Sequence, residues 1–552
     1  MDTLGMSHAV LGAAATVPTT QILRELLSQE MAGSLLWLRA VGEAILKLFG
    51  LDDPNALMAA SQEDVERIKE ANPQLKDAAF LVPALGRPKA FVMSGALLAP
   101  TGYTATDRTV VSLQMSPDFS GSPFYPESSG VTYGPESGNP ETLSLHGVTV
   151  GGGFVESFAF GGQAPLNGQS GGDAQEMASP IEPLSLAKAV GISSAGPASA
   201  FTQFAHLADV TFLDPISNYW AVTSEQQPGP QRAMTYQLGD GGNVDNSGLL
   251  AALQRGATRL VWLINTQTAI STEAGFCSMT TAEQMGEVSD QLEFQLQANF
   301  GFVTKNQVGQ FLSRNQVFAR EELAPLLCEL QALLRAGRPT MVKRRMAVLA
   351  NDWWGIKSYT AVVIFVYADR CSNFEDLLPQ DTKDELGQGA LGKFANYPHY
   401  DVVFQNVGET TALLPQQVNL LAAQSEYGVR QNQQLFQTLL FCQVDTGGTC
   451  HIFSCSSSRN AACVNGHCVC DTQADMCAVD GACVSSLGTS MAAETLSAQW
   501  TGSGEALVEG TSTTFLLAGC VALAAICASL LAASGRLWRR RRMHIPQEPL
   551  LG

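Results

Sequence analysis

The chain has 552 residues, of which 45% are hydrophobic, so it is long enough for one large α/β domain with appendages or for about two to four domains. Its formal net charge of -19 argues against a nucleic-acid partner, because no basic surface outside the last residues could neutralise phosphates. Only 15% of the residues are charged, a composition found more often in lumenal or extracellular proteins than in cytosolic ones.

The first 160 residues change from helical to strand-like patterning. Apolar residues recur at helical spacing over 22–51, which predicts two helices or one bent helix that ends at Gly50. A capping-box pattern at 61–64 begins a shorter predicted helix over 60–70. From 80 to 160, short apolar runs alternate with Gly, Pro and Ser clusters, which predicts strands joined by long loops.

The next segments lead to a glycine corner. Residues 161–180 are polar and hold no aromatic anchor, which predicts a surface loop. Helical spacing returns over 184–190 and 198–207. Residues 1–20 contain no basic segment followed by an apolar core, so no secretory signal precedes these elements.

Asp240 stands on the corner, ahead of a helical run over 249–256 and a strand-like run over 260–264. The glycines that follow it permit positive φ and the close approach of another segment or a ligand, so the corner is predicted to present a carboxylate. An ordinary Asp-Gly turn is the alternative. A calcium loop is excluded, because the third and fifth positions of the run carry no side-chain oxygen.

Helices and one strong strand are predicted beyond the corner. Residues 286–300 and 305–336 have helical spacing, with a break or restart expected at Pro325. The run YTAVVIFVY at 359–367 predicts a buried strand. Residues 418–441 predict a closing helical stretch.

Several of these segments together resemble the patatin-like and cytosolic phospholipase/lysophospholipase superfamily. They are 193–197, the corner 240–242 with Asn246 and its helix, and the tail segments 373–379 and 398–400. The resemblance covers about residues 90–440. It implies an α/β fold with a patatin-like sheet flanked by helices, incomplete at its N-terminus, and it implies neither cofactor nor metal.

The resemblance also implies a Ser-Asp dyad, in which a serine attacks an ester carbonyl and Asp240 is the general base. Gly241, Gly242 and Asn246 would then be the binding residues around the acid. His206 or His399 could instead complete a Ser-His-Asp triad, although the dyad needs no histidine and a lone histidine is more often structural.

The nucleophile should lie in a Gly-x-Ser-x-Gly turn between a strand and a helix. Ser170 fits the literal pattern at 168–172, with the glycines 151–153 ahead of it, but its flanking residues suit neither a strand nor a helix. Ser7 lacks the downstream glycine. The sequence therefore favours a third interpretation, in which the chain begins after the nucleophile turn and the targeting segment and is inactive as given.

A cysteine cluster predicts a separate disulfide-rich module. Its members are Cys442, Cys450, Cys455, Cys463, Cys468, Cys470, Cys477 and Cys483. Residues 463–470 resemble the core of EGF-like modules, and the spacing leaves the pairing open. Zinc binding, with His451 and His467 nearby, is the alternative.

Residues 515–533 carry no charge and are long enough to span a bilayer as a helix. Arginines follow directly at 536–542, so the positive-inside rule places the tail in the cytoplasm and the preceding chain in the lumen or outside.

The predicted organisation is a phospholipase-like domain, an EGF-like Cys-rich module, a linker, a transmembrane helix and a basic cytoplasmic tail. Their boundaries are 1–441, 442–485, 486–513, 514–534 and 535–552. The expected function is that of a membrane-anchored lipid acyl hydrolase, whose partners are membrane lipids and not nucleic acid. The alternative is a non-catalytic single-pass surface protein that uses the fold and the Cys-rich module to bind lipid or protein.

Overall fold

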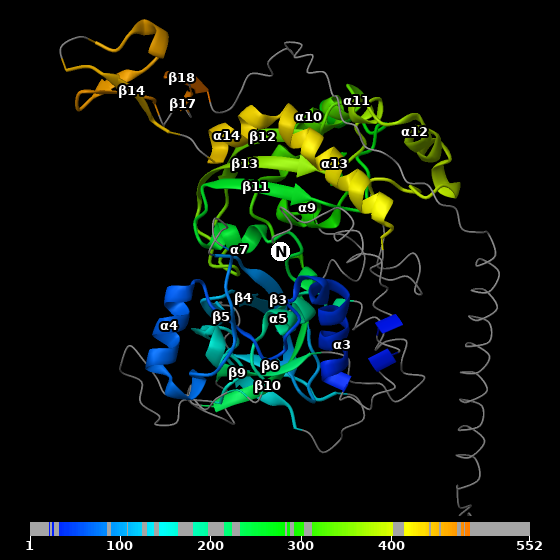
Figure 1. Cartoon of the computed structure of the whole chain (residues 1–552), viewed down its shortest axis with the longest axis vertical. Coiled ribbons are helices and arrows are strands. Elements are labelled where there is room, and N and C mark those ends of the chain that lie inside the picture. Colours follow the sequence, from blue (N-terminus) through cyan, green and yellow to red (C-terminus); the bar gives the residue numbers. More distant parts are fainter. Residues whose placement is uncertain are drawn as a thin grey trace, which may run out of the picture. The chain divides into compact units, whose positions relative to one another are not determined.

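The computed structural model describes most residues between 21 and 485, and Figure 1 shows their helices and strands in colour. The longest stretches outside the description are 1–20, 27–32, 124–129, 137–142, 164–179, 197–214, 223–231, 303–311, 401–412 and 486–552, and shorter ones include 441–442. Several sequence predictions fall in those stretches. They are the helix at 198–207, the linker, the cytoplasmic tail, and the residues Ser7, Ser170, His206 and Cys442.

The first half of the chain forms a curled, six-stranded sheet in the spatial order β8-β5-β4-β3-β10-β9. Its strands are β3 (Met93–Pro100), β4 (Val111–Met115), β5 (Phe119–Ser122), β8 (Gly153–Glu156), β9 (Ile216–Val222) and β10 (Arg232–Asp240). Every neighbouring pair is antiparallel. The predicted strand-and-loop character of 80–160 is confirmed.

The predicted fold class, an α/β domain with a patatin-like sheet flanked by helices, is wrong, because the main sheet is antiparallel throughout. Only residues 101–110 and 116–118 connect β3, β4 and β5. Such short connections turn the chain back on itself, whereas a parallel neighbour needs a crossover of about a dozen residues or more. The resemblance rested on short segments near Asp240, and these contain no information about strand direction.

The same fold prediction included a transmembrane helix. In the described part of the chain, no helix combines the length and the apolar character needed to cross a bilayer. The run predicted to do so, 514–534, lies outside the described residues.

A second, three-stranded sheet has the order β11-β13-β12. Its strands are β11 (Arg259–Ile264), β12 (Met341–Val348) and β13 (Tyr359–Tyr367). β11 and β13 run parallel, and β12 is antiparallel to β13. β13 covers the whole YTAVVIFVY run and is central in its sheet, so the prediction of a buried strand is confirmed.

Two N-terminal helices follow the local sequence signals. α3 (Gly33–Val41) continues into a short π-helical turn and a 3-10 turn, and the run ends at Gly50, whose φ of 64° is left-handed. Glycine adopts that conformation without the Cβ clash that other residues meet. α4 (Gln62–Ala71) is capped by the Ser61 side chain, which accepts a hydrogen bond from the Asp64 backbone N–H, as predicted.

The remaining helices match the predicted ranges only in part. They are α5 (Leu186–Ser193), α7 (Leu249–Gln254), α9 (Phe294–Asn299), α10 (Leu323–Arg335), α11 (Ser372–Glu375), α12 (Gln380–Gly387), α13 (Pro415–Gln431) and α14 (Gln433–Leu440). The restart expected at Pro325 is confirmed to within two residues, because α10 begins at Leu323 and this proline lies in its first turn. Backbone N–H groups have no helical partner there, so a proline removes no hydrogen bond.

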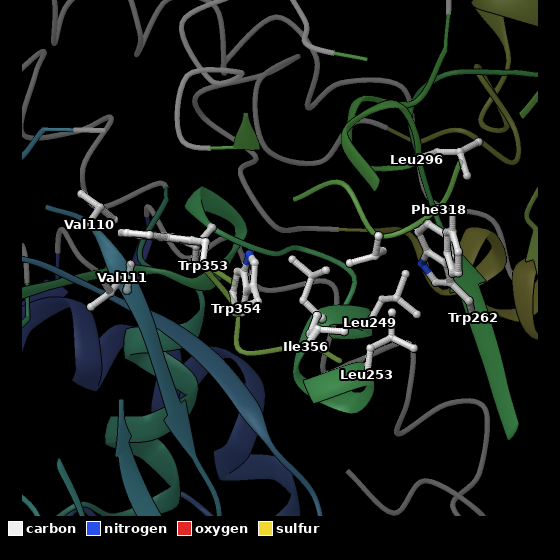
Figure 2. Packing of buried hydrophobic residues seen from close by; sticks show 14 of the residues in the cluster. Val110, Val111, Leu249, Leu253, Trp262, Leu296, Phe318, Trp353, Trp354 and Ile356 are labelled. Carbon is white, nitrogen blue, oxygen red and sulfur yellow. The ribbon is translucent and has the colours of Figure 1, made fainter. Parts of the chain in front are cut away.

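One hydrophobic cluster contains residues of both sheets and of the helices between them. Figure 2 shows part of it, with Val110 and Val111 near the tryptophans Trp353 and Trp354, and with Leu249 of α7 beyond them. Trp354 is 1% exposed, and its indole N–H donates to Asn315 Oδ1 at 3.0 Å. The antiparallel sheet and the mixed sheet therefore share a core.

Small two-stranded pairs complete the first 150 residues. They are β1 (Leu57–Met58) with β2 (Phe80–Leu81), which are parallel, and β6 (Val131–Tyr133) with β7 (Leu145–Val148), which are antiparallel.

Candidate functional site

Asp240 is the last residue of β10, where it pairs with Gly95 of β3. A 3-10 turn, Gly241–Asn243, follows directly, and then come α7 and β11. The predicted order of corner, helix and strand is therefore confirmed. The corner places the carboxylate at the end of a strand in the interior of the six-stranded sheet.

Both oxygens of the Asp240 carboxylate accept backbone hydrogen bonds. Oδ1 accepts from the Gly242 N–H and Oδ2 from the Gly196 N–H, each at 2.7 Å. Burial raises the pKa of Asp240 above its usual value, and the two backbone hydrogen bonds oppose this effect only in part. The result is a fixed and partly desolvated carboxylate.

Gly196 comes from a segment that follows α5, so two of the segments that carried the family resemblance lie in direct contact. They are separated by 44 residues in sequence. A Cβ at Gly196 would lie 3.0 Å from Asp240 Oδ2, and one at Gly242 would lie 3.0 Å from Asp240 Oδ1. Small residues on both sides allow the backbone N–H groups to reach the carboxylate.

The glycines after Asp240 are needed for space and not for backbone conformation, since Gly241 and Gly242 are absent from the residues with positive φ. A Cβ at Gly241 would lie 2.3 Å from the carbonyl oxygen of Ser94 and 2.5 Å from its carbonyl carbon. Of the two properties of glycine expected to matter at the corner, positive φ is not used at Gly241 or Gly242, and the close approach of β3 to Gly241 is confirmed.

Substitution Gly241→Ala is expected to lower the free energy of unfolding by about 1–3 kcal/mol, because the new methyl group meets backbone atoms that cannot rotate away. Gly134→Ala is the matched control, since nothing lies within 4 Å of a Cβ there. Urea unfolding measures both variants. Equal unfolding midpoints for the two would contradict the steric explanation.

Two neighbours complete the corner. The Asn246 side-chain oxygen is placed against Gly242, where it would lie 3.0 Å from an added Cβ. Gln295, from α9, donates from Nε2 to the Gly242 carbonyl at 3.3 Å. Sequence reasoning missed Gln295, because it lies 53 residues away and no local pattern marks it.

Asp245 is a second buried carboxylate of the corner that sequence reasoning did not identify. Its oxygens accept hydrogen bonds from the backbone N–H and the hydroxyl of Ser247 and from the Leu250 N–H. It thus holds the beginning of α7. An Asp two residues before a Ser is a known local turn signal, and it could have identified this role.

The predicted partners of Asp240 are not brought to it among the described residues. Ser170, Ser7 and His206 lie outside the description. His399 is described, and its Nδ1 lies 2.8 Å from the Thr266 carbonyl oxygen while its Nε2 lies 3.2 Å from Asp369 Oδ1. His399 is therefore placed beside Asp369, and the alternative triad of His399 with Asp240 is wrong, whereas the triad through His206 stays a prediction.

The cysteine module contains the predicted disulfides. Cys450–Cys463 and Cys455–Cys468 cross in sequence, and Cys470–Cys483 follows them. Cys477 is also disulfide-bonded. The sulfurs of Cys450, Cys455 and Cys468 cluster within 4.8 Å, but disulfide sulfurs offer no thiolate to zinc.

The module is built from short strands. They are β14 (Asp445–Thr449), β15 (Ala462–Val464), β16 (His467–Val469), β17 (Met476–Val479) and β18 (Ala482–Ser485). Arg459 joins two of its loops, because its guanidinium donates to the carbonyls of Thr446 and Gly481. The EGF-like resemblance stays a prediction.

A further disulfide, Cys277–Cys328, joins a 3-10 turn to α10 in the main domain. No local pattern pairs these two cysteines, which lie 51 residues apart. Disulfides persist in oxidising compartments. The location of the chain outside the cytosol stays a prediction.

No protein-family model, curated protein or solved structure matches this chain. The residues of the corner and of the disulfides are therefore the observations from which a function can be inferred.

Proposed function

We propose that Asp240 is the general base of a lipid acyl hydrolase. The observation that carries the proposal is the pair of 2.7 Å hydrogen bonds that hold its carboxylate at the end of β10. The proposal depends on the local site and on the resemblance of its segments, and it does not require a patatin-like sheet.

The chemistry follows from the state of this carboxylate. Each carboxylate oxygen has two lone pairs, so one on each oxygen is still free to accept a serine hydroxyl. The raised pKa of Asp240 makes it a stronger base than an ordinary aspartate, which favours removal of the hydroxyl proton during attack on an ester. The two backbone N–H groups fix its direction, as a two-residue site requires.

The nucleophile is not assigned. Within the described residues, the hydrogen bonds to the Asp240 carboxylate come from backbone N–H groups. Ser170 keeps the Gly-x-Ser-x-Gly pattern and stays a prediction, as does attachment of the chain to a membrane through 514–534.

A second candidate function is a non-catalytic surface protein that binds lipid or protein. One observation favours it. The two backbone hydrogen bonds to the Asp240 carboxylate are fully explained by a structural role, in which the carboxylate holds the corner together. The crosslinked cysteine module would then supply a rigid binding surface.

The two functions are separated by treating the full chain with a fluorogenic phospholipid and, in parallel, with a fluorophosphonate that modifies activated serines. We expect time-dependent release of fatty acid, and we expect one serine to carry the phosphonate in mass spectra of tryptic peptides. Ser170→Ala then shows whether that serine is the one modified. A chain that neither hydrolyses the lipid nor reacts with the phosphonate is the non-catalytic protein.

A further inference from the structure

A cavity of about 300 Å³ lies between α3, the segment that follows it, and the beginning of α5. This volume is at the lower end of the range for small-molecule sites. Apolar side chains, including Leu35, Leu38 and Pro54, form part of its wall.

Lys188 of α5 also lines this cavity, and its side chain is only 7% exposed. Within the described part of the chain its ammonium has one partner, Glu182 Oε2, at 3.4 Å. An ammonium has three donors, so two find no acceptor among the residues that the structure describes. A buried charge with unfilled donors is costly unless a ligand or water supplies the acceptors.

The other charges at the cavity limit what can bind. Arg39 is exposed at the cavity and forms no ion pair with any described residue. The cavity is also lined by the carboxylates of Glu182, Glu43 and Asp52. Glu182 pairs with Lys188, and Glu43 lies 3.6 Å from Lys47 Nζ. These acids repel negative charge, so they disfavour a doubly charged ligand more than a singly charged one whose charge faces Lys188.

We infer that this cavity binds the carboxylate of a short acyl chain, with Lys188 as its principal donor and the apolar wall against the chain. A carboxylate oxygen accepts the hydrogen bonds that the ammonium lacks, and charge-assisted hydrogen bonds of this kind are short and strong. The methylenes leave water for Leu35, Leu38 and Pro54. The inference does not depend on ester hydrolysis, because binding of a free acid needs no reaction.

Burial lowers the pKa of Lys188, with Glu182 opposing the effect in part. The folded protein therefore loses this proton at a lower pH than an ordinary lysine does. Binding of a carboxylate should weaken as the pH rises through that lowered pKa, because the ammonium donors disappear.

The test is isothermal titration of the full chain with octanoate, compared with octanol and octyl phosphate. We expect octanoate to bind, and we expect Lys188→Met to weaken it by about 10-fold to 100-fold, the range for hydrogen bonds to a charged group. Lys76→Met, at an exposed lysine, is the control that leaves binding unchanged. Octanol lacks the charge and should bind equally to the wild type and to Lys188→Met.

The Lys188→Met variant is expected to fold, because methionine keeps the apolar stem and Glu182 is 43% exposed and can be solvated by water. A measurement on the wild type adds independent evidence: octanoate should protect Lys188, and not Lys76, from acetylation by an N-hydroxysuccinimide ester. Equal octanoate affinity in the wild type and Lys188→Met, tighter binding of octyl phosphate than of octanoate, or unprotected Lys188 would each overturn the inference.

Discussion

Replacing Asp240 by asparagine is expected to lower the rate of ester hydrolysis per folded molecule by a factor of about 10² to 10⁴, the usual contribution of a general base. Asparagine has nearly the same shape, but it cannot take the serine proton. The asparagine side-chain oxygen can accept one of the two backbone hydrogen bonds. Its NH₂ group then faces the other backbone N–H, and two donors cannot form a hydrogen bond. We expect a loss of about 1–3 kcal/mol of stability from that unpaired donor.

Asp245→Asn is the matched control, because Asp245 is a neighbouring carboxylate that is 3% exposed and also accepts backbone hydrogen bonds. The Asp245→Asn substitution should lower the free energy of unfolding and leave the rate of ester hydrolysis per folded molecule unchanged. The folded fraction of each variant is measured by circular dichroism under the assay conditions. Equal rate losses in the two variants, or an unchanged rate in Asp240→Asn, would exclude Asp240 as the base.

The pH dependence gives a second readout for Asp240. Because burial raises its pKa, the carboxylate should be protonated, and hydrolysis lost, at a higher pH than for an ordinary aspartate. The effect of pH on the free energy of unfolding has the opposite direction to its effect on the rate. A raised pKa of Asp240 in the folded state contributes stability at low pH, and this contribution is lost as the pH rises through that pKa. Asp240→Asn should remove both the acidic limb of the rate profile and this stability term.

Removing the Cys277–Cys328 disulfide is expected to lower the free energy of unfolding of the main domain by about 4 kcal/mol. The bond closes a loop with a sequence separation of 51, so its loss frees many conformations of the unfolded chain. The Cys277→Ala/Cys328→Ala double variant tests this by urea unfolding, followed through tryptophan fluorescence of the main domain.

The control is Cys470→Ala/Cys483→Ala, which removes a module disulfide of sequence separation 13. It should loosen the module and leave the main-domain transition in place. Cys371, a buried free thiol, is kept in both variants. A main-domain midpoint that is the same in the Cys277→Ala/Cys328→Ala protein as in the wild type would show that this crosslink does not constrain the fold.

The candidate site could be predicted in part. Asp240, its glycines and the helix after it are contiguous, so their order was readable from the sequence. The Gly196 N–H and the Gln295 amide reach the corner from distant segments, and no local pattern marks Gln295. Gly196 does lie in one of the segments that carried the resemblance, but only the fold shows that its N–H reaches Asp240. Lys188 lies in no motif, and its surroundings depend on how α3 packs beside α5.

The sequence by itself determined the elements that depend on near neighbours in the chain. These are the Ser61 cap of α4, the end of the first helical run at Gly50, the strand β13 and the disulfide character of the cysteine module. Each follows from side-chain periodicity, a cap or a spacing within a few residues.

Only the tertiary structure decided the direction and order of the strands, the pairing of Cys277 with Cys328, and the partner of His399. Those features depend on which distant segments pack together. The free energy of such packing comes from the shared core, and a short window of sequence does not specify which segments enter it.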